Sequence, residues 1–264
     1  MISRALSIAG SDSSGGAGIQ ADLKTFTVVG VYGMTAITAV TAQNTLGVEG
    51  IHPLPASFVR QQIDVVLGDI GADAVKTGML FSADIVAAVA AAVRDHGITQ
   101  LVVDPVLVAG SGASLARDDV SQALLAELIP RALLVTPNSE EAEVLTGIHV
   151  VSVADMIAAG RRIVDAGARA CLIKGGHLGG SQAIDVLVDG RSTRELRCER
   201  LSTRHTHGTG CQLSAAITAF LARGMNLEAA VEKGKAFITA AIKAALALGR
   251  GQGPANPLGW RDAD

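Results

Sequence analysis

With 264 residues, of which 49% are hydrophobic and 18% charged, the chain is long enough to bury a large core and too apolar to be a disordered tail. Its formal net charge of −3 supplies no basic surface that would call for nucleic acid. Aromatic residues make up only 3%, and a core of Ala, Val, Leu and Ile favours buried parallel strands under helices over an aromatic-rich sandwich.

Cysteine content and hydropathy indicate the cellular compartment of the protein. Cys171, Cys198 and Cys211 include no CxxC pair and are odd in number, so we expect a reducing compartment and no disulfide framework. The longest strongly apolar run, residues 85–93, is well short of the roughly 18 residues that suggest a membrane span. The first residues lack the regions of a signal peptide. We therefore expect a cytoplasmic protein without membrane contact.

Short strand-like runs alternate with helical runs along the chain. In the first half, strands are expected at 5–9, 34–41, 74–77 and 101–104, and helices at 17–29, 57–67, 82–94 and 118–128. In the second half, strands are expected at 133–136 and 171–174, an antiparallel edge pair at 184–188 and 194–198, and helices at 140–145, 153–166, 212–222 and 227–248. No linker or internal repeat interrupts this order. The pattern predicts one α/β domain over residues 1–264, with a mostly parallel central sheet flanked by helices on both faces.

Polar residues follow several of these strands, where ligands bind in parallel sheets. They are Gly10-Ser11-Asp12, Gln43-Asn44, Lys76-Thr77-Gly78, Asp104-Pro105, Asn138 and Lys174. Any one of them could be an ordinary turn or cap residue. Their shared position is what predicts a site at this edge.

The glycine-rich segment 10–18 joins the first strand to the first helix. It is not a P-loop, because Gly16 and Ala17 stand where the motif needs Lys and a hydroxyl. Gly16, Gly18 and Ala21 match the spacing of a dinucleotide fingerprint, so a Rossmann-type oxidoreductase is a rival. That fingerprint also expects an acidic residue after the second strand, where this chain has Gln43-Asn44.

A second candidate is His207-Gly208-Thr209-Gly210-Cys211, which runs into an apolar helix. Backbone amides at a helix start are unpaired donors with partial positive charge, so Gly208, Thr209 and Gly210 can hold an anion such as a phosphoryl group. Thiol pKa values are commonly lowered at such positions, and Cys211 could be a proton acceptor, a nucleophile activated by a nearby histidine, or a packing residue. A metal site built from His205, His207 and Cys211 would lack an evident fourth ligand.

A third candidate follows the strand at 133–136. Asn138 can cap the next helix, with Glu141 completing a capping box. The same amide and carboxylate can help to hold hydrated Mg²⁺, with Asp104 adding charge in the same region. Lys174 can offer a point charge to phosphate. The capping and metal interpretations are compatible.

Together these motifs resemble the hydroxymethylpyrimidine and phosphomethylpyrimidine kinases of thiamine biosynthesis, in the ribokinase-like superfamily. The resemblance spans nearly the whole chain and rests on Ala9-Gly10-Ser11-Asp12, residues 14–25, Thr41-Ala42-Gln43-Asn44-Thr45, Lys76-Thr77-Gly78-Met79, Asp104-Pro105-Val106, Thr136-Pro137-Asn138, Lys174-Gly175-Gly176-His177 and Thr206-His207-Gly208-Thr209-Gly210-Cys211. It implies a three-layer ribokinase-like fold, ATP, Mg²⁺, a homodimer, and phosphorylation of 4-amino-5-hydroxymethyl-2-methylpyrimidine and then of its monophosphate.

The resemblance also implies roles for individual residues. On the substrate side, Gln43 would bind the pyrimidine, Gly10 and Asp22 would line the hydroxymethyl end, and Met79 and Val106 would form an apolar wall. On the nucleotide side, Asp104, Asn138 and Glu141 would hold Mg-ATP, with Asp104 and Glu141 reaching the metal through water, and Lys174 would meet the phosphates. Between them, Gly208, Thr209, Gly210 and Cys211 would form the anion hole, with Cys211 as base. One carboxamide both donates and accepts, which suits Gln43 to a ring nitrogen beside an amine.

The chain also departs from the family pattern. It lacks the Lys or Thr often found before Ser111-Gly112, and it has Gln212 where Thr is common. The first puts a lid or phosphate contact in question, and the second bears on the surroundings of the anion hole. Pyridoxal kinases share this architecture, so pyridoxal is an alternative substrate, and a non-catalytic pyrimidine sensor is a further alternative.

Overall fold

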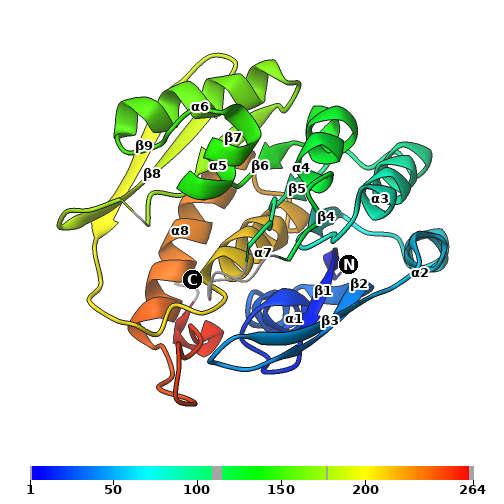
Figure 1. Cartoon of the computed structure of the whole chain (residues 1–264), viewed down its shortest axis with the longest axis horizontal. Coiled ribbons are helices and arrows are strands. Elements are labelled where there is room, and N and C mark those ends of the chain that lie inside the picture. Colours follow the sequence, from blue (N-terminus) through cyan, green and yellow to red (C-terminus); the bar gives the residue numbers. More distant parts are fainter. Residues whose placement is uncertain (1, 109–114, 177, 262–264) are drawn as a thin grey trace.

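The computed structural model describes residues 2–108, 115–176 and 178–261. Its nine strands form one sheet in the order β3-β2-β1-β4-β5-β6-β7-β8-β9. Helices cover both faces of this sheet (Figure 1). The mostly parallel sheet between two helical layers confirms the fold class expected from the alternating elements. Residues 109–114, which include Ser111-Gly112, and residue 177 lie outside the described residues.

The inner strands of the sheet are parallel. They are β1 (Arg4–Asp12), β2 (Tyr32–Gln43), β4 (Ala74–Thr77), β5 (Leu101–Val103), β6 (Leu134–Val135) and β7 (Ala170–Ile173). The antiparallel strands are β3 (Val48–Pro53), beside β2, and β8 (Gln182–Asp189) and β9 (Thr193–Glu199), beyond β7. The pair β8 and β9 confirms the expected antiparallel edge. Strand β3 was not expected, because its short, largely exposed sequence contains Gly50 and ends at Pro53.

Two hydrophobic clusters, one on each face, hold the layers together. One face carries α1 (Gly18–Val28), α7 (Thr209–Ala222), α8 (Leu227–Lys243) and the short 3-10 turn η3 (Pro257–Gly259). The other carries α2 (Ala56–Asp69), α3 (Ala83–Asp95), α4 (Val120–Ala123) with the π-helical turn η1 (Leu124–Leu128) and the 3-10 turn η2 (Ile129–Arg131), α5 (Ser139–Thr146) and α6 (Val153–Asp165). Strand β5 shows the principle: Leu101 and Val103 join one cluster and Val102 the other. Its uninterrupted apolar sequence therefore reflects burial on both faces.

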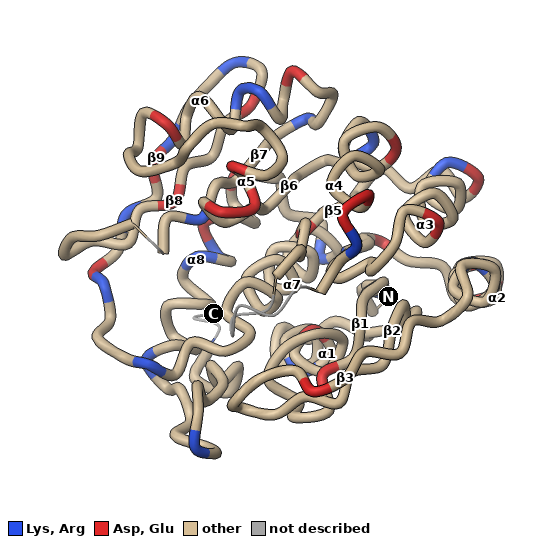
Figure 2. The backbone as a smooth tube through the Cα atoms, viewed as in Figure 1, with Lys and Arg blue, Asp and Glu red and all other residues tan. Residues whose placement is uncertain are grey.

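Helix α7 lies against the middle of the sheet, packed on β1, β4 and β5. Residues 212–222 of this helix are all buried, which explains its apolar sequence. Charged residues concentrate on outer helices and turns, with few on the central strands (Figure 2). Buried charges such as Asp22, Lys76 and Asp104 are therefore exceptions that require partners.

The end of the chain returns to the carboxyl edge of the sheet. Helix α8 stops at Lys243, five residues before the expected end, and Leu246 then donates to the Pro254 carbonyl. The tail also bonds to two site-bearing loops, from Gln252 to Thr45 and from Ala255 to His207. The expected helix at 118–128 is likewise divided between α4 and η1. At the end of α8 the contacts with the tail, rather than helix propensity, set the boundary.

Candidate active site

The polar residues expected at the strand ends meet at one edge of the sheet. Across the sheet they come in the order Gln43 at the end of β2, Asp12 at the end of β1, Asp104 after β5, Asn138 after β6 and Lys174 after β7. The chain reverses its direction of travel across the sheet at β1 and β4, which is where parallel sheets bind ligands. The edge therefore has a Gln43 side and a Lys174 side, with α7 between them.

The loop that precedes α7 has a backbone that only glycine adopts readily. Gly208 is the N-cap, with φ of +76°, and a Cβ built there would lie 1.8 Å from the Gly16 carbonyl oxygen. The Thr209 amide donates back to the Thr206 carbonyl at 3.3 Å. The next amides, of Gly210 and Cys211, belong to the first helical turn, which leaves them without intrahelical acceptors. We call residues 208–211 the anion loop.

Lys174 joins the anion loop to the acidic side of the site. Its Nζ lies 2.9 Å from Asp104 Oδ1 and 3.7 Å from Glu141 Oε2. A Cβ built on Gly210 would lie 3.2 Å from the same Nζ, so the ammonium group directly neighbours the loop. Burial disfavours its charge, but Asp104 and Glu141 outweigh burial and raise the pKa of Lys174. The side chain is a cation held beside unpaired amides.

Asp104 is a buried carboxylate with hydrogen-bond partners on both oxygens. Its Oδ1 accepts from Lys174 and from Thr136 Oγ1 at 3.1 Å, and its Oδ2 accepts from Ser214 Oγ at 3.0 Å. Burial works to raise its pKa, yet the nearby lysines Lys174 and Lys76 hold that pKa below the usual range. Asp104 therefore stays charged, and it ties α7 to the ends of β5 and β6.

Asn138 and Glu141 form the capping box expected from the sequence. The Asn138 amide donates to Glu141 Oε2 at 2.8 Å, and the Glu141 amide donates to Asn138 Oδ1 at 2.8 Å. Burial raises the pKa of Glu141 to about 7 despite the neighbouring Lys174. The local positive charge is thus insufficient for a second buried carboxylate beside Asp104.

A hydrated Mg²⁺ would supply the positive charge that the protein lacks beside Asp104 and Glu141. Within residues 2–108, 115–176 and 178–261, no group of three or more His, Cys, Asp or Glu could hold a metal ion. Mg²⁺ usually keeps several waters and takes one or two carboxylates together with substrate phosphates. The pair Asp104 and Glu141 supplies that number of ligands.

The raised pKa of Glu141 predicts a pH dependence of stability. The folded protein keeps this proton up to about pH 7, whereas the usual value is 4.5. Protonation of Glu141 therefore contributes fully to the free energy of unfolding below pH 4.5, and this contribution is lost as the pH rises through about 7. In chelator-treated protein without nucleotide, Glu141→Gln should gain stability relative to the parent between about pH 5.5 and about pH 8, measured by urea unfolding. A gap that is constant across this range would contradict the raised pKa.

Cys211 differs from the expectation of a lowered thiol pKa. Burial raises the pKa of the Cys211 thiol to about 11, against the opposing effects of Lys76 and a hydrogen bond from the Gly18 amide. The helix start is therefore outweighed by burial. His207 Nε2 lies 2.8 Å from Asp12, and His205 Nδ1 accepts from the Gly253 amide at 3.1 Å. These partners give no support to a cysteine nucleophile activated by histidine.

The Gln43 side of the edge contains the residues expected to hold substrate. At the end of β2, the Thr41 hydroxyl donates to the Ser11 carbonyl at 2.7 Å, and its oxygen lies 3.2 Å from Gln43 Oε1. Met79 and Val106 belong to one small hydrophobic cluster, as an apolar wall requires. A Cβ built on Gly10 would lie 2.9 Å from Met79 Sδ, so Gly10 leaves room for that side chain. The structure thus brings Gly10, Met79 and Val106 together.

Asp22 is fully buried, with protein partners for both carboxylate oxygens. Oδ1 accepts from Lys76 Nζ at 2.7 Å and Oδ2 from Ser7 Oγ at 2.6 Å. A contact between Asp22 and substrate therefore stays a prediction. Lys76 was noted in the sequence only as a strand-end residue, and the structure shows it completely buried and paired with Asp22. The available signal was a lysine inside the short buried strand Ala74–Thr77.

An anion loop, a buried lysine and two carboxylates on a three-layer α/β fold define a phosphotransferase for small molecules. A comparison with protein-family models agrees: the model described as phosphomethylpyrimidine kinase matches residues 12–256. The chain belongs to the phosphomethylpyrimidine kinase family. This membership overturns the Rossmann-type oxidoreductase as a rival.

Individual relatives resemble the chain over nearly its whole length. The hydroxymethylpyrimidine/phosphomethylpyrimidine kinase of Bacillus subtilis (strain 168) is 48% identical over 261 residues, covering 98% of this chain and 96% of the relative. The enzyme of the same name from Rhizobium meliloti (strain 1021) is 49% identical over 267 residues, covering 99% and 100%.

Solved structures show the same architecture. Staphylococcus aureus pyridoxal kinase in complex with AMP-PCP has a TM-score of 0.92 at 35% identity, covering 99% of this chain and 96% of that one. Phosphomethylpyrimidine kinase from Clostridium difficile 630 has a TM-score of 0.80 at 43% identity, covering 90% and 98%. The ribokinase-like fold expected from the motifs is thereby confirmed.

Proposed function

We propose that the chain transfers the γ-phosphoryl group of ATP to the hydroxymethyl group of 4-amino-5-hydroxymethyl-2-methylpyrimidine, and then phosphorylates the monophosphate to the pyrophosphate. The observation that carries this proposal is the position of Lys174, which lies between the anion loop and the carboxylates of Asp104 and Glu141. The names of the curated relatives support the choice of substrate.

Each group has a part in the transfer. The amides of the anion loop receive the negative charge that develops on the moving phosphoryl group, and Lys174 adds a fixed positive charge beside them. Asp104 and Glu141 would hold Mg²⁺ through water, and the ion would neutralise phosphate charge. Gln43 orients the pyrimidine through its carboxamide. The Met79 and Val106 wall keeps water from the acceptor side.

As a proton acceptor, Cys211 would have to react as a thiolate, which requires a change in its protonation state. A thiol with a pKa of about 11 is mostly protonated at neutral pH, so the thiolate must be stabilised when the substrates bind. The backbone amides need no such change. We therefore place the larger share of catalysis on the anion loop.

Replacing the thiol tests this division. Cys211→Ala should lower kcat by up to about 100-fold if the thiol accepts the hydroxyl proton. Cys198→Ala is the control, because Cys198 is also a partly buried free thiol but lies on the edge strand β9. Steady-state ADP release with the pyrimidine measures both variants. An unchanged kcat in Cys211→Ala would remove the thiol from the mechanism and leave only the amides.

ADP release measured in parallel with the pyrimidine and with pyridoxal tests the substrate. We expect a clear preference for the pyrimidine. The second candidate is pyridoxal, because Staphylococcus aureus pyridoxal kinase in complex with AMP-PCP and pyridoxal matches this fold with a TM-score of 0.90. Preference for pyridoxal would overturn the substrate and keep the mechanism. Thermal stabilisation by the pyrimidine without turnover would instead indicate a sensor.

The assembly and location of the protein complete the proposal. We expect a cytoplasmic homodimer, with ATP and Mg²⁺ as the phosphoryl donor pair and no nucleic-acid partner. In the part of the chain that the structure describes, no helix combines the length and the apolar character needed to cross a membrane. Light scattering after size-exclusion chromatography would measure the subunit number.

A further inference from the structure

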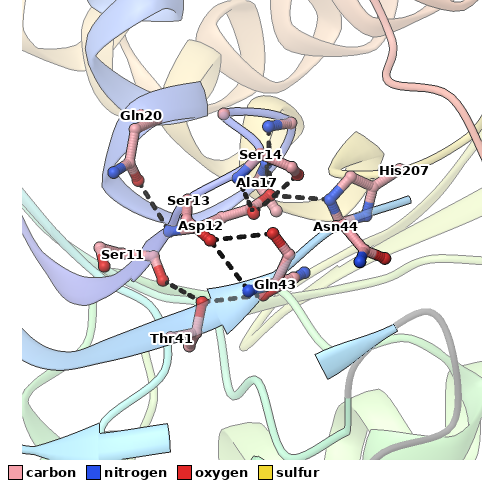
Figure 3. A network of polar contacts seen from close by, with 12 residues as sticks. Ser11, Asp12, Ser13, Ser14, Ala17, Gln20, Thr41, Gln43, Asn44 and His207 are labelled. Carbon is pink, nitrogen blue, oxygen red and sulfur yellow. Dashed lines mark hydrogen bonds and ion pairs between the residues drawn. The ribbon is translucent and has the colours of Figure 1, made fainter. Parts of the chain in front are cut away.

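The carboxylate of Asp12 is the centre of a hydrogen-bond network outside the groups that react. Its Oδ1 accepts from the amide and hydroxyl of Ser14, at 2.9 and 2.7 Å. Its Oδ2 accepts from the amides of Gly16 and Ala17, at 3.1 and 2.8 Å, and lies 2.8 Å from His207 Nε2 (Figure 3). The residue is 2% exposed. One buried carboxylate thus binds its own loop and a residue that precedes the anion loop.

The loop after Asp12 packs against the anion loop without spare room. A Cβ built on Gly16 would lie 2.4 Å from His207 Cδ2, and one built on Gly208 would lie 1.8 Å from the Gly16 carbonyl oxygen. Each glycine is therefore covered by the opposite loop. A change in the distance between Asp12 and His207 must move Gly208, the first residue of the anion loop.

The same segment is fastened to the Gln43 side of the site. Ser13 Oγ donates to the Gln43 carbonyl at 2.8 Å and accepts from the Gln43 amide at 2.9 Å (Figure 3). The neighbours Asp12 and Ser13 therefore bond in opposite directions, one to His207 and the other to Gln43. Hydrogen bonds of Ser13 and Asp12, which are adjacent in the chain, thus link the end of β2 to the residue before the anion loop.

The backbone of His207 is hydrogen-bonded to the C-terminal segment of the chain. Its amide donates to the Gly253 carbonyl at 3.1 Å, and its carbonyl accepts from the Ala255 amide at 3.2 Å. With the backbone fixed on one side and the imidazole on the other, His207 has little freedom to shift. The anion loop begins at the next residue.

We propose that the Asp12–His207 pair positions the anion loop relative to the pyrimidine held by Gln43, so that the acceptor oxygen and the moving phosphoryl group are in line. The inference rests on the proposed function. Asp12 and the His207 ring bond to groups of the protein itself, so the proposal treats both as positioning residues. A misplacement of about 1 Å far from the chemistry can cost about 100-fold in rate, which is the scale of effect we expect.

The charge state of Asp12 suits a permanent anchor. Although burial alone would raise its pKa, hydrogen bonds from His207, Ser14 and Ala17 hold that pKa at about 2. Asp12 is therefore a carboxylate at every working pH, and its acceptor sites are constant.

Variants at His207 separate positioning from binding. His207→Leu should lower kcat about 100-fold, while the Kd values for ATP and the pyrimidine change by less than about 3-fold. His207→Gln keeps a donor toward Asp12 and should restore most of kcat. His96→Leu is the control: it removes a histidine 2.7 Å from Asp64, far from the carboxyl edge, and should leave kcat unchanged. Asp12→Asn combined with His207→Leu should be no slower than the slower single variant.

Amide hydrogen exchange provides a readout that does not depend on turnover. In His207→Leu the amides of Thr209 and Gln212, which donate to the Thr206 and Gly208 carbonyls, should exchange faster than in the parent, while those within α8 should not change. If the parent releases no ADP with either acceptor, the proposed function fails and the exchange data still test the positioning. Unchanged exchange at Thr209 and Gln212, or a loss confined to ligand affinity with normal kcat, would overturn the inference. Failure of His207→Gln to recover activity would also count against it.

Discussion

Gly208→Ala is expected to lower kcat by about 100-fold or more, because a methyl group at this position displaces amides that receive the moving phosphoryl group. The backbone of Gly208 has φ of +76°, where a residue with a side chain costs about 1–2 kcal/mol. The added Cβ would also lie 1.8 Å from the Gly16 carbonyl oxygen, which is a backbone atom and cannot rotate away. The two loops must therefore separate. Steady-state kinetics should show a larger effect on kcat than on the KM for ATP.

Gly30→Ala is the matched control for this substitution. Gly30 has nearly the same backbone, with φ of +78°, but a Cβ there meets nothing within 4 Å. It imposes the left-handed strain without the collision. We expect a loss of stability of about 1 kcal/mol with kcat unchanged. Normal kcat in Gly208→Ala, or an equal loss of kcat in both variants, would contradict the role of the anion loop.

Local sequence patterns predicted the layers and the edge on which the site lies. The three residues of β5 are all apolar, and a strand that buries both faces needs that composition. The glycines of the anion loop also have a local signature, because a helix start that approaches another backbone closely excludes side chains. The capping box of Asn138 and Glu141 spans only four residues. Features of this kind are decided within one turn or one strand.

Long-range partners could not be predicted in the same way. Lys76 meets Asp22 across 54 positions, and His207 meets Asp12 across 195. Nothing in the spacing of such residues indicates that they pair, because the sheet order decides it. The pKa of the Cys211 thiol has the same origin: a helix start lowers a thiol pKa in isolation, but desolvation at the assembled site raises this one. The sequence shows which groups reach the edge and not how each is surrounded there.

Lys174→Met should lower kcat by about 100- to 1,000-fold, because it removes a fixed charge beside the developing negative charge. The methionine has a similar length and no charge. Loss of the lysine charge also leaves Asp104, which is 1% exposed, without its closest cation. Breaking a buried pair by removing one partner costs about 3–5 kcal/mol. Urea unfolding measures this cost separately from catalysis. To separate the effect of the lost charge on kcat from the effect of lost stability, a second variant with a similar loss of stability is needed.

Lys235→Met supplies that comparison. Lys235 is 14% exposed and lies 2.6 Å from the buried Asp185, whereas Lys174 is 13% exposed and lies 2.9 Å from Asp104. Asp185 also accepts from the Gly175 amide at 3.0 Å, so Lys235→Met can loosen the chain next to Lys174 without removing the charge at the anion loop. We expect a comparable loss of stability with near-normal kcat. Equal losses of kcat would show that Lys174 acts through stability alone. A Lys174→Met variant that only raised the KM for ATP would show that its charge acts in binding and not in the transfer.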